Sequence, residues 1–141
     1  MNLVDRCVLT EKHILVADDD QSVREALRFL LSVDRHTVTE AVDGRQALDL
    51  FAKQRFDLVI TDYAMPGIGG EELVQEIRKL APEHPIIMAT AHAENLPIQT
   101  KNRSSTLPKP FALNELRIAI ASVMGLEASD WVNSLDAGLR H

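Results

Sequence analysis

The sequence contains almost no cysteine, which excludes two kinds of small protein. Cys7 is the single thiol among 141 residues, and one thiol can neither close an internal disulfide nor build a zinc cluster. The composition is otherwise that of one ordinary globular domain, with 45% hydrophobic and 26% charged residues. A chain of this length buries about 68–70% of its unfolded surface, so it can fold around a core without a covalent brace.

The sequence also lacks long apolar runs and an excess of positive charge. No stretch approaches the ~20 apolar residues that cross a bilayer, and the first residues carry charges where a signal peptide would be apolar. We therefore expect a cytoplasmic protein that makes no membrane contact. The formal net charge is −6, which argues against direct nucleic-acid binding because phosphate backbones attract basic surfaces.

No internal repeat is present, and short apolar runs instead alternate with longer helical patterns. Residues 13–17, 58–60 and 86–89 form continuous, mainly apolar runs. Such runs are typical of strands that are buried on both faces of a parallel sheet. Residues 37–42 and the short piece around Thr106 and Leu107 are weaker candidates. The pattern predicts five strands.

Between these strands, apolar residues recur at the spacing of a helix. The four sets are Val23, Ala26, Leu27, Leu30 and Leu31; Ala47, Leu50 and Phe51; Leu73, Ile77 and Leu80; and Leu116, Ala119, Ile120, Val123 and Met124. Residues 94–105 are polar and contain Pro97, and they are predicted to form a further short or distorted helix. The alternation predicts an α/β fold, a doubly wound five-stranded parallel sheet with helices on both faces.

Reactive side chains follow the predicted strands at their carboxyl ends, where ligands bind in open parallel sheets. Asp18 and Asp19 follow the first strand, Asp62 the third, Thr90 the fourth and Lys109 the fifth. Two carboxylates repel one another by ~4 kcal/mol at about 4 Å and an effective dielectric of about 20, so such a cluster needs a cation. Oxygen ligands with room for water suit Mg²⁺.

Four sequence blocks resemble the receiver domain of bacterial two-component response regulators. The blocks are Val16-Ala17-Asp18-Asp19-Asp20, Asp62-Tyr63-Ala64-Met65-Pro66 with Gly70 beyond it, Thr90-Ala91, and Lys109-Pro110-Phe111. The resemblance covers residues 12–124 and implies a single (βα)₅ domain of the flavodoxin-like, CheY-like kind. Residues 1–11 are then expected to be an N-terminal extension, and residues 125–141 a tail too short to be an output domain.

The resemblance also implies a role for the acidic residues. Asp62 would accept a phosphoryl group from a histidine of a sensor histidine kinase or a phosphotransfer protein. Asp18, Asp19, Asp62 and the backbone carbonyl of Ala64 would hold Mg²⁺. Such a domain catalyses only its own aspartyl phosphorylation and dephosphorylation, so it is not an enzyme in the usual sense. It signals by protein contact or by onward phosphotransfer.

The remaining residues of the resemblance concern switching. Lys109 and the Thr90 hydroxyl would contact the phosphoryl group and draw the loop after the fourth strand into a second arrangement. Family members commonly carry Tyr or Phe three residues before the lysine, where this chain has Thr106. Ala64 and His92 stand where the family varies its rate of dephosphorylation.

Two other functions stay open at the level of sequence. Asp18-Asp19-Asp20-Gln21-Ser22 also fits the D-x-D-x-[ST] pattern of haloacid-dehalogenase-type phosphatases, in which Asp18 would be the nucleophile. That pattern requires an acidic pair after a later strand, and the fourth strand ends without one. An EF-hand is excluded because Val23 and Phe29 stand where Gly and Glu are needed. The other open function is a receiver that no longer switches and serves only as a protein-binding module.

Overall fold

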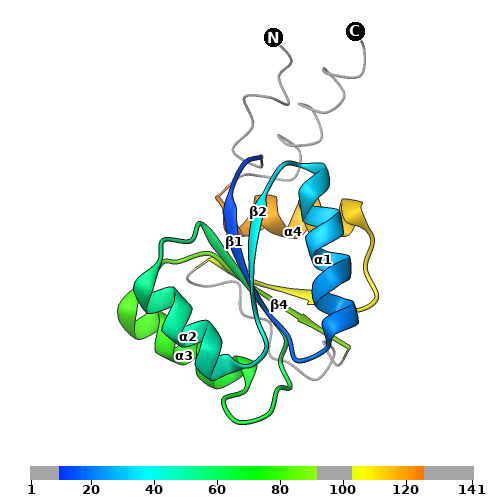
Figure 1. Cartoon of the computed structure of the whole chain (residues 1–141). Coiled ribbons are helices and arrows are strands. Elements are labelled where there is room, and N and C mark those ends of the chain that lie inside the picture. The colour runs from blue at the N-terminus through cyan, green and yellow to red at the C-terminus, as the bar shows by residue number, and fades with distance from the viewer. Residues whose placement is uncertain (1–9, 92–102, 126–141) are drawn as a thin grey trace, which may run out of the picture.

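One parallel sheet with helices on both faces makes up the fold (Figure 1), and this computed structural model describes residues 10–91 and 103–125. The strands are β1 (His13–Ala17), β2 (Thr37–Ala41), β3 (Leu58–Thr61), β4 (Ile86–Thr90) and β5 (Ser104–Pro108). The helices are α1 (Gln21–Val33), α2 (Gly44–Lys53), α3 (Gly70–Leu80) and α4 (Leu113–Val123). The strand order is β2-β1-β3-β4-β5 and every pair is parallel. The predicted α/β fold is therefore confirmed.

The central strands are buried on both faces, which explains why their sequences are continuously apolar. In β1, Ile14 and Val16 belong to one core, whereas Leu15 and Ala17 belong to the other. The first core is closed by α1 and α4 through Leu27, Leu31, Leu116 and Ile120. The second is closed by α2 and α3 through Ala47, Leu73 and Ile77. Figure 1 shows these two helix pairs on opposite sides of the sheet.

Two helices begin at aspartates that the sequence places directly before them. The Asp20 side chain accepts a hydrogen bond from the backbone N–H of Ser22 at the start of α1. The Asp43 side chain does the same for Gln46 at the start of α2. Such caps satisfy donors that the first helical turn leaves unpaired. Capping at Asp20 means that α1 starts immediately beside the carboxyl end of β1.

The prediction of a helix over residues 94–105 is wrong at its end. Ser104 and Ser105 belong to β5, where they pair with Ile86 and Ile87 of β4. Because β5 lies at the edge of the sheet, its polar residues resemble a loop in the sequence. Arg103 is in a bend, and residues 94–102 of that predicted helix, including Pro97, lie outside the described residues, as does His92.

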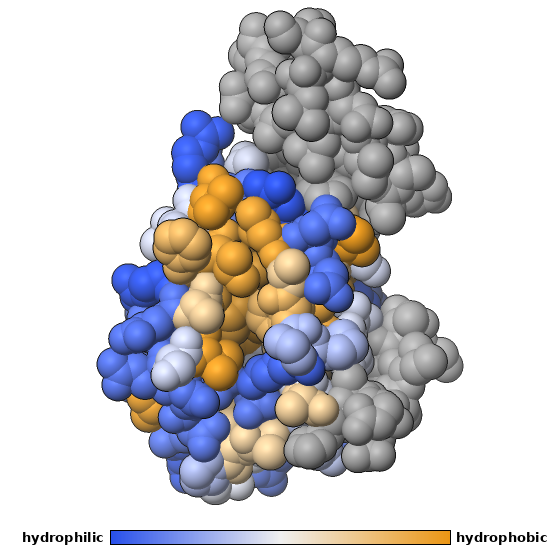
Figure 2. Space-filling view, turned by 90° about the vertical axis from the view of Figure 1, so that its right-hand side faces the viewer, coloured by the Kyte–Doolittle hydropathy of each residue, from blue (hydrophilic) through white to orange (hydrophobic). Residues whose placement is uncertain are grey.

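Apolar side chains gather between polar borders on the side of the molecule that carries α1 and α4 (Figure 2). The exposed apolar residues of these two helices are Phe29, 69% exposed, Val33, 50% exposed, and Ile118, 38% exposed. Large apolar groups in contact with water are a common feature of surfaces that bind other proteins.

None of the helices in the described ranges is long and apolar enough to cross a membrane.

Candidate functional site

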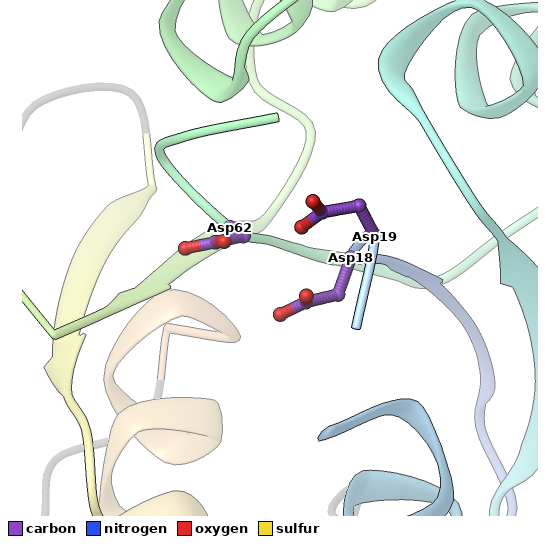
Figure 3. A group of neighbouring side chains, drawn as sticks. All are labelled: Asp18, Asp19 and Asp62. Atoms are coloured by element: carbon purple, nitrogen blue, oxygen red, sulfur yellow. The ribbon is translucent and has the colours of Figure 1, made fainter. Parts of the chain in front are cut away.

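The site lies where β1 and β3 end side by side. Asp18 and Asp19 come directly after β1, and Asp62 comes directly after β3. The backbone N–H of Asp62 donates to the Ala17 carbonyl oxygen at 2.9 Å, which extends the pairing of the two strands up to the acidic residues. One carboxylate oxygen from each aspartate lies within 4.8 Å of the other two. Figure 3 shows that the Asp18 and Asp19 side chains reach from the end of β1 toward the side of Asp62.

Asp18 is buried, and both of its carboxylate oxygens are already occupied. Its side chain keeps only 3% of its surface exposed, and Oδ2 lies 2.8 Å from the Nζ atom of Lys109. Oδ1 accepts the backbone N–H of Asp20 at 2.9 Å. A buried carboxylate is stable only when its charge and its lone pairs are compensated. Asp18 therefore holds Lys109 in the site and has little freedom to attack a substrate.

Asp62 is more accessible than Asp18. Its side chain is 14% exposed. Oδ1 accepts the backbone N–H of Tyr63 at 2.8 Å and lies 3.5 Å from Lys109 Nζ. Within the described ranges no hydrogen bond reaches Oδ2. Burial raises the pKa of Asp62 above its ordinary value, Lys109 opposes that rise, and the neighbouring charge of Asp18 adds to it.

The strands β4 and β5 bring the remaining predicted residues to the same edge. Thr90 is the last residue of β4 and is 1% exposed. The backbone N–H of Lys109 donates to the Thr90 carbonyl oxygen at 2.9 Å, so the end of β4 positions the backbone from which the lysine extends. A cis peptide bond follows between Lys109 and Pro110. The structure therefore brings Thr90, Lys109 and the three aspartates to one edge of the sheet.

The loop after β3 packs closely under the start of α3. The backbone N–H of Gly70 donates to the Tyr63 carbonyl oxygen at 2.8 Å. A Cβ atom at Gly70 would overlap the carbonyl oxygen of Asp62. Only glycine, which has no Cβ, allows this close approach of the two backbones. Ala64 is exposed in the same loop, and the use of its carbonyl as a metal ligand stays a prediction.

The donor set fits a hard divalent cation. Three carboxylates face one ammonium group, Lys109, so negative charge is in excess and the carboxylates repel one another. Asp19 is exposed, and no hydrogen bond or ion pair to its side chain occurs within residues 10–91 and 103–125. Carboxylate oxygens with access to water are the ligands that Mg²⁺ prefers. A bound cation would relieve the repulsion between these groups.

Sequence reasoning missed one residue next to this cluster, Arg24. Its guanidinium donates to the Asp18 carbonyl oxygen and forms an ion pair with Glu40 of β2. A signal was present in the helical periodicity. Arg24 lies three residues before Leu27 and seven before Leu31, so it shares the inward face of α1 although it is charged. A charged residue on a buried face needs a partner, and this one has two.

Comparison with known proteins gives one family over most of the chain. The model of a family described as the response regulator receiver domain matches residues 14–121. A curated relative, the response regulator MprA of Mycolicibacterium vanbaalenii, is 43% identical over 106 residues, which are 73% of this chain and 46% of the relative. This chain thus matches about half the length of that relative.

Solved structures agree with the family match. The response regulator TrrA of Thermotoga maritima, solved in complex with Mg²⁺-BeF, has a TM-score of 0.73 and 34% identity, and covers 79% of this chain and 98% of its own. TrrA in complex with the histidine kinase ThkA has a TM-score of 0.72 and 33% identity, with 80% and 98% coverage.

Proposed function

The chain belongs to the response regulator receiver domain family, and we propose that it accepts a phosphoryl group on Asp62 in a two-component or phosphorelay signalling system. The observation that carries the proposal is the contrast between two carboxylates of one site. Asp18 has both oxygens occupied and is buried, whereas Asp62 is more exposed and keeps Oδ2 without a donor in the described ranges. Asp19 is exposed as well, but Asp62 has the ammonium group of Lys109 beside it, so Asp62 is the carboxylate that we propose attacks an incoming phosphorus atom.

The proposed reaction transfers a phosphoryl group from a histidine nitrogen of the partner to a carboxylate oxygen of Asp62. Asp62 Oδ2 attacks the phosphorus atom of a phosphohistidine, the phosphorus–nitrogen bond breaks, and the electron pair leaves with the imidazole nitrogen. An acyl phosphate on Asp62 results. Water later attacks the same phosphorus atom and restores the carboxylate with release of inorganic phosphate. Positioning and charge compensation supply most of the catalysis in phosphoryl transfer.

The residues around Asp62 supply that compensation. Lys109 Nζ, 3.5 Å from Asp62 Oδ1, places a compact positive charge where negative charge gathers on the phosphoryl oxygens. Asp18, Asp19 and Asp62 would hold Mg²⁺, with the Ala64 carbonyl as a further ligand. When bound, this cation adds charge neutralisation at the phosphoryl oxygens. Thr90, the last residue of the neighbouring strand β4, is the predicted hydroxyl that would contact the acyl phosphate.

The partner that follows from this chemistry is a histidine kinase or a histidine phosphotransfer protein. The complex of TrrA with ThkA supports this choice for a chain that shares its fold. The downstream partner is a protein that binds the phosphorylated form or takes the group onward. Thr106 lies in β5 with intermediate exposure. Because this position has no aromatic ring, a change in the position of Thr90 on phosphorylation would have to be transmitted to the surface through other side chains.

The phosphatase alternative loses support from the environment of Asp18. A nucleophile needs a free oxygen at the substrate, and both oxygens of Asp18 are bound by Lys109 and the Asp20 N–H. The family match also points away from it. The non-switching receiver differs from our proposal in its chemistry, because it would bind its partner without gaining a phosphoryl group.

Intact mass tests the proposal. The full chain is incubated with Mg²⁺ and acetyl phosphate, beside Asp62→Asn and beside a sample with the metal chelated. We expect wild type to gain one phosphoryl group only with Mg²⁺ present, and Asp62→Asn to gain none. A gain that persists in Asp62→Asn and disappears in Asp18→Asn would favour the phosphatase mechanism. No gain from acetyl phosphate or from a phosphorylated histidine phosphotransfer protein would favour the non-switching module.

A further inference from the structure

We propose that Arg24 is a positioning residue that holds the peptide between Asp18 and Asp19 and thereby sets the affinity of the site for Mg²⁺. This inference rests on the proposed function, because it concerns the metal that the acidic cluster would bind. In the described structure, Arg24 makes no hydrogen bond or ion pair with the carboxylates of Asp18, Asp19 or Asp62, and the proposal gives it no contact with the phosphoryl group. Its effect passes through the backbone.

The guanidinium of Arg24 connects three elements. Nη1 donates to the Asp18 carbonyl oxygen at 2.6 Å, and Nε pairs with Glu40 Oε1 at 3.1 Å. The other carboxylate oxygen of Glu40 is held by Arg28 Nη2 at 2.8 Å. The Arg24 side chain is only 11% exposed, so the two bonds that Arg24 itself makes are partly shielded from water. Arg24 in α1 thus ties the end of β1 to β2.

The hydrogen bond from Arg24 to the Asp18 carbonyl oxygen orients the peptide group that leads into Asp19. The carbonyl of Asp18 and the N–H of Asp19 belong to one planar peptide group, so fixing that oxygen also fixes the direction in which the backbone enters Asp19. The Asp19 side chain is exposed and has no hydrogen bond to any residue in the described ranges. Its carboxylate is therefore aligned through the backbone alone. Asp18, in contrast, is held independently by Lys109 and the Asp20 N–H.

Positioning and simple charge predict opposite results when Arg24 is replaced. A positive charge close to a cation site weakens cation binding by repulsion, so loss of that charge alone would tighten Mg²⁺ binding. Loss of the bond to the Asp18 carbonyl would instead leave Asp19 less well aligned and weaken Mg²⁺ binding. Lysine keeps the charge but lacks the planar group that serves two acceptors at once. Both Arg24→Gln and Arg24→Lys should therefore weaken binding if Arg24 acts by position.

Arg28 provides a matched control. It lies one turn further along α1 and pairs with the same Glu40, but its side chain is 56% exposed and it has no contact with Asp18 in the described structure. Arg28→Gln removes the same charge from the same helix and leaves the Asp18 carbonyl bonded. Its Mg²⁺ affinity should stay within twofold of wild type.

The test is isothermal titration calorimetry of the full chain with Mg²⁺ and no phosphodonor, with thermal unfolding to check the fold. We expect the dissociation constant to rise about tenfold in Arg24→Gln and Arg24→Lys, the size usual for groups that orient metal ligands. At saturating Mg²⁺, phosphorylation by acetyl phosphate should return close to the wild-type rate. Should Arg24→Gln fail to fold, Arg24→Lys, which keeps the charge and the aliphatic stem, decides the question.

The outcomes separate this inference from the proposed function. Unchanged or tighter Mg²⁺ binding in a folded Arg24 variant, with wild type binding Mg²⁺ and phosphorylated on Asp62, overturns the role of Arg24 alone. Equal weakening in Arg28→Gln also overturns it, since that variant leaves the carbonyl contact in place. Wild type that binds no Mg²⁺ overturns both the inference and the metal requirement of the proposed function.

Discussion

At the scale of single residues, the site assigns different roles to side chains of one type. Asp18, Asp19 and Asp62 are chemically identical, and their surroundings distinguish them. Asp18 is closed in by Lys109 and a backbone donor, Asp19 is exposed, and Asp62 lies between these extremes. Of the three, Asp62 combines an oxygen without a donor in the described ranges with a nearby ammonium group, Lys109 Nζ at 3.5 Å, and this combination selects it as the proposed phosphoacceptor.

Gly70 is the residue that allows Asp62 its position. Because a Cβ at Gly70 would overlap the Asp62 carbonyl oxygen, Gly70→Ala must displace backbone rather than a flexible side chain. We expect the free energy of unfolding to fall by about 1–3 kcal/mol, as for other overpacked sites. The rate of phosphorylation by acetyl phosphate should also fall. Urea unfolding and intact mass measure the two effects.

Gly69→Ala is the control for this prediction. A Cβ there would lie 3.3 Å from the Tyr63 carbonyl oxygen, a tight contact that a shift of a few tenths of an ångström relieves. We expect a clearly smaller loss of stability than in Gly70→Ala. Equal losses in the two variants would show that the overlap with Asp62 is not the cause.

At the scale of elements, an ion pair joins the two helices that share one face of the sheet. Asp34, which caps the end of α1, accepts two hydrogen bonds from the guanidinium of Arg117 in α4, at 2.8 and 2.7 Å. The side chains are 15% and 24% exposed. Two parallel bonds between planar groups give an ion pair its best geometry. The pair fixes α4 against α1 at the end of the sheet opposite the acidic cluster.

A double-mutant cycle with Asp34→Asn and Arg117→Gln measures this pair. We expect a coupling free energy of about 1–2 kcal/mol in urea unfolding, because the bonds are charge-assisted and partly buried. The matched control is Glu76 and Lys79 within α3, which lie 3.2 Å apart and are largely exposed. Exposed helix pairs of this kind contribute about 0.5 kcal/mol or less. Equal couplings would refute the stronger role of Asp34 and Arg117.

At the scale of the whole molecule, two histidines make stability depend on pH, His36, which is buried, and His84, which is half-buried. Burial lowers the pKa of His36, with Lys12 adding to the effect and Asp34 and Asp57 opposing it. Burial also lowers the pKa of His84, with Arg78 adding to it. The Nε2 atoms of both rings are buried and have no hydrogen-bond partner among the described residues. Because His36 Nδ1 accepts the Lys12 backbone N–H at 3.0 Å, the neutral ring carries its proton on Nε2, and a second proton would replace that hydrogen bond at Nδ1.

The sign of the pH effect follows from these lowered pKa values. The unfolded chain binds protons to both histidines at a higher pH than the folded chain does, so stability is full above the ordinary histidine pKa of about 6.5 and is lost as pH falls through the folded values. We expect the free energy of unfolding to decline from about pH 7 downward. Urea unfolding across this range measures it.

Two variants, His36→Asn and His84→Phe, test whether the histidines cause that decline. In the wild type, His36 Nδ1 accepts the Lys12 backbone N–H at 3.0 Å, and the side-chain oxygen of asparagine can accept the same hydrogen bond. Each variant should flatten the decline relative to wild type. Asp62, whose pKa is raised in the folded chain, contributes in the opposite direction and is unchanged in these comparisons. An identical slope in both variants and wild type would rule the histidines out.

Most of the fold is predictable from sequence because buried parallel strands and amphipathic helices impose strong periodicities. The strands at residues 13–17, 58–60 and 86–89 and the four helical patterns all have counterparts in the structure. The failure at residues 104 and 105 has a physical cause. An edge strand has one unpaired side in contact with water, so its composition need not be apolar.

The sequence by itself determined the alternation of strands and helices, and with it the meeting of acidic residues at one edge, because the carboxyl ends of parallel strands lie together. Only the tertiary structure decided how these residues differ. Contacts between residues far apart in the chain, such as Lys109 with Asp18 and Arg24 with Glu40, depend on strand order and helix packing. No local pattern carries that information, since burial and charge compensation are properties of the assembled molecule.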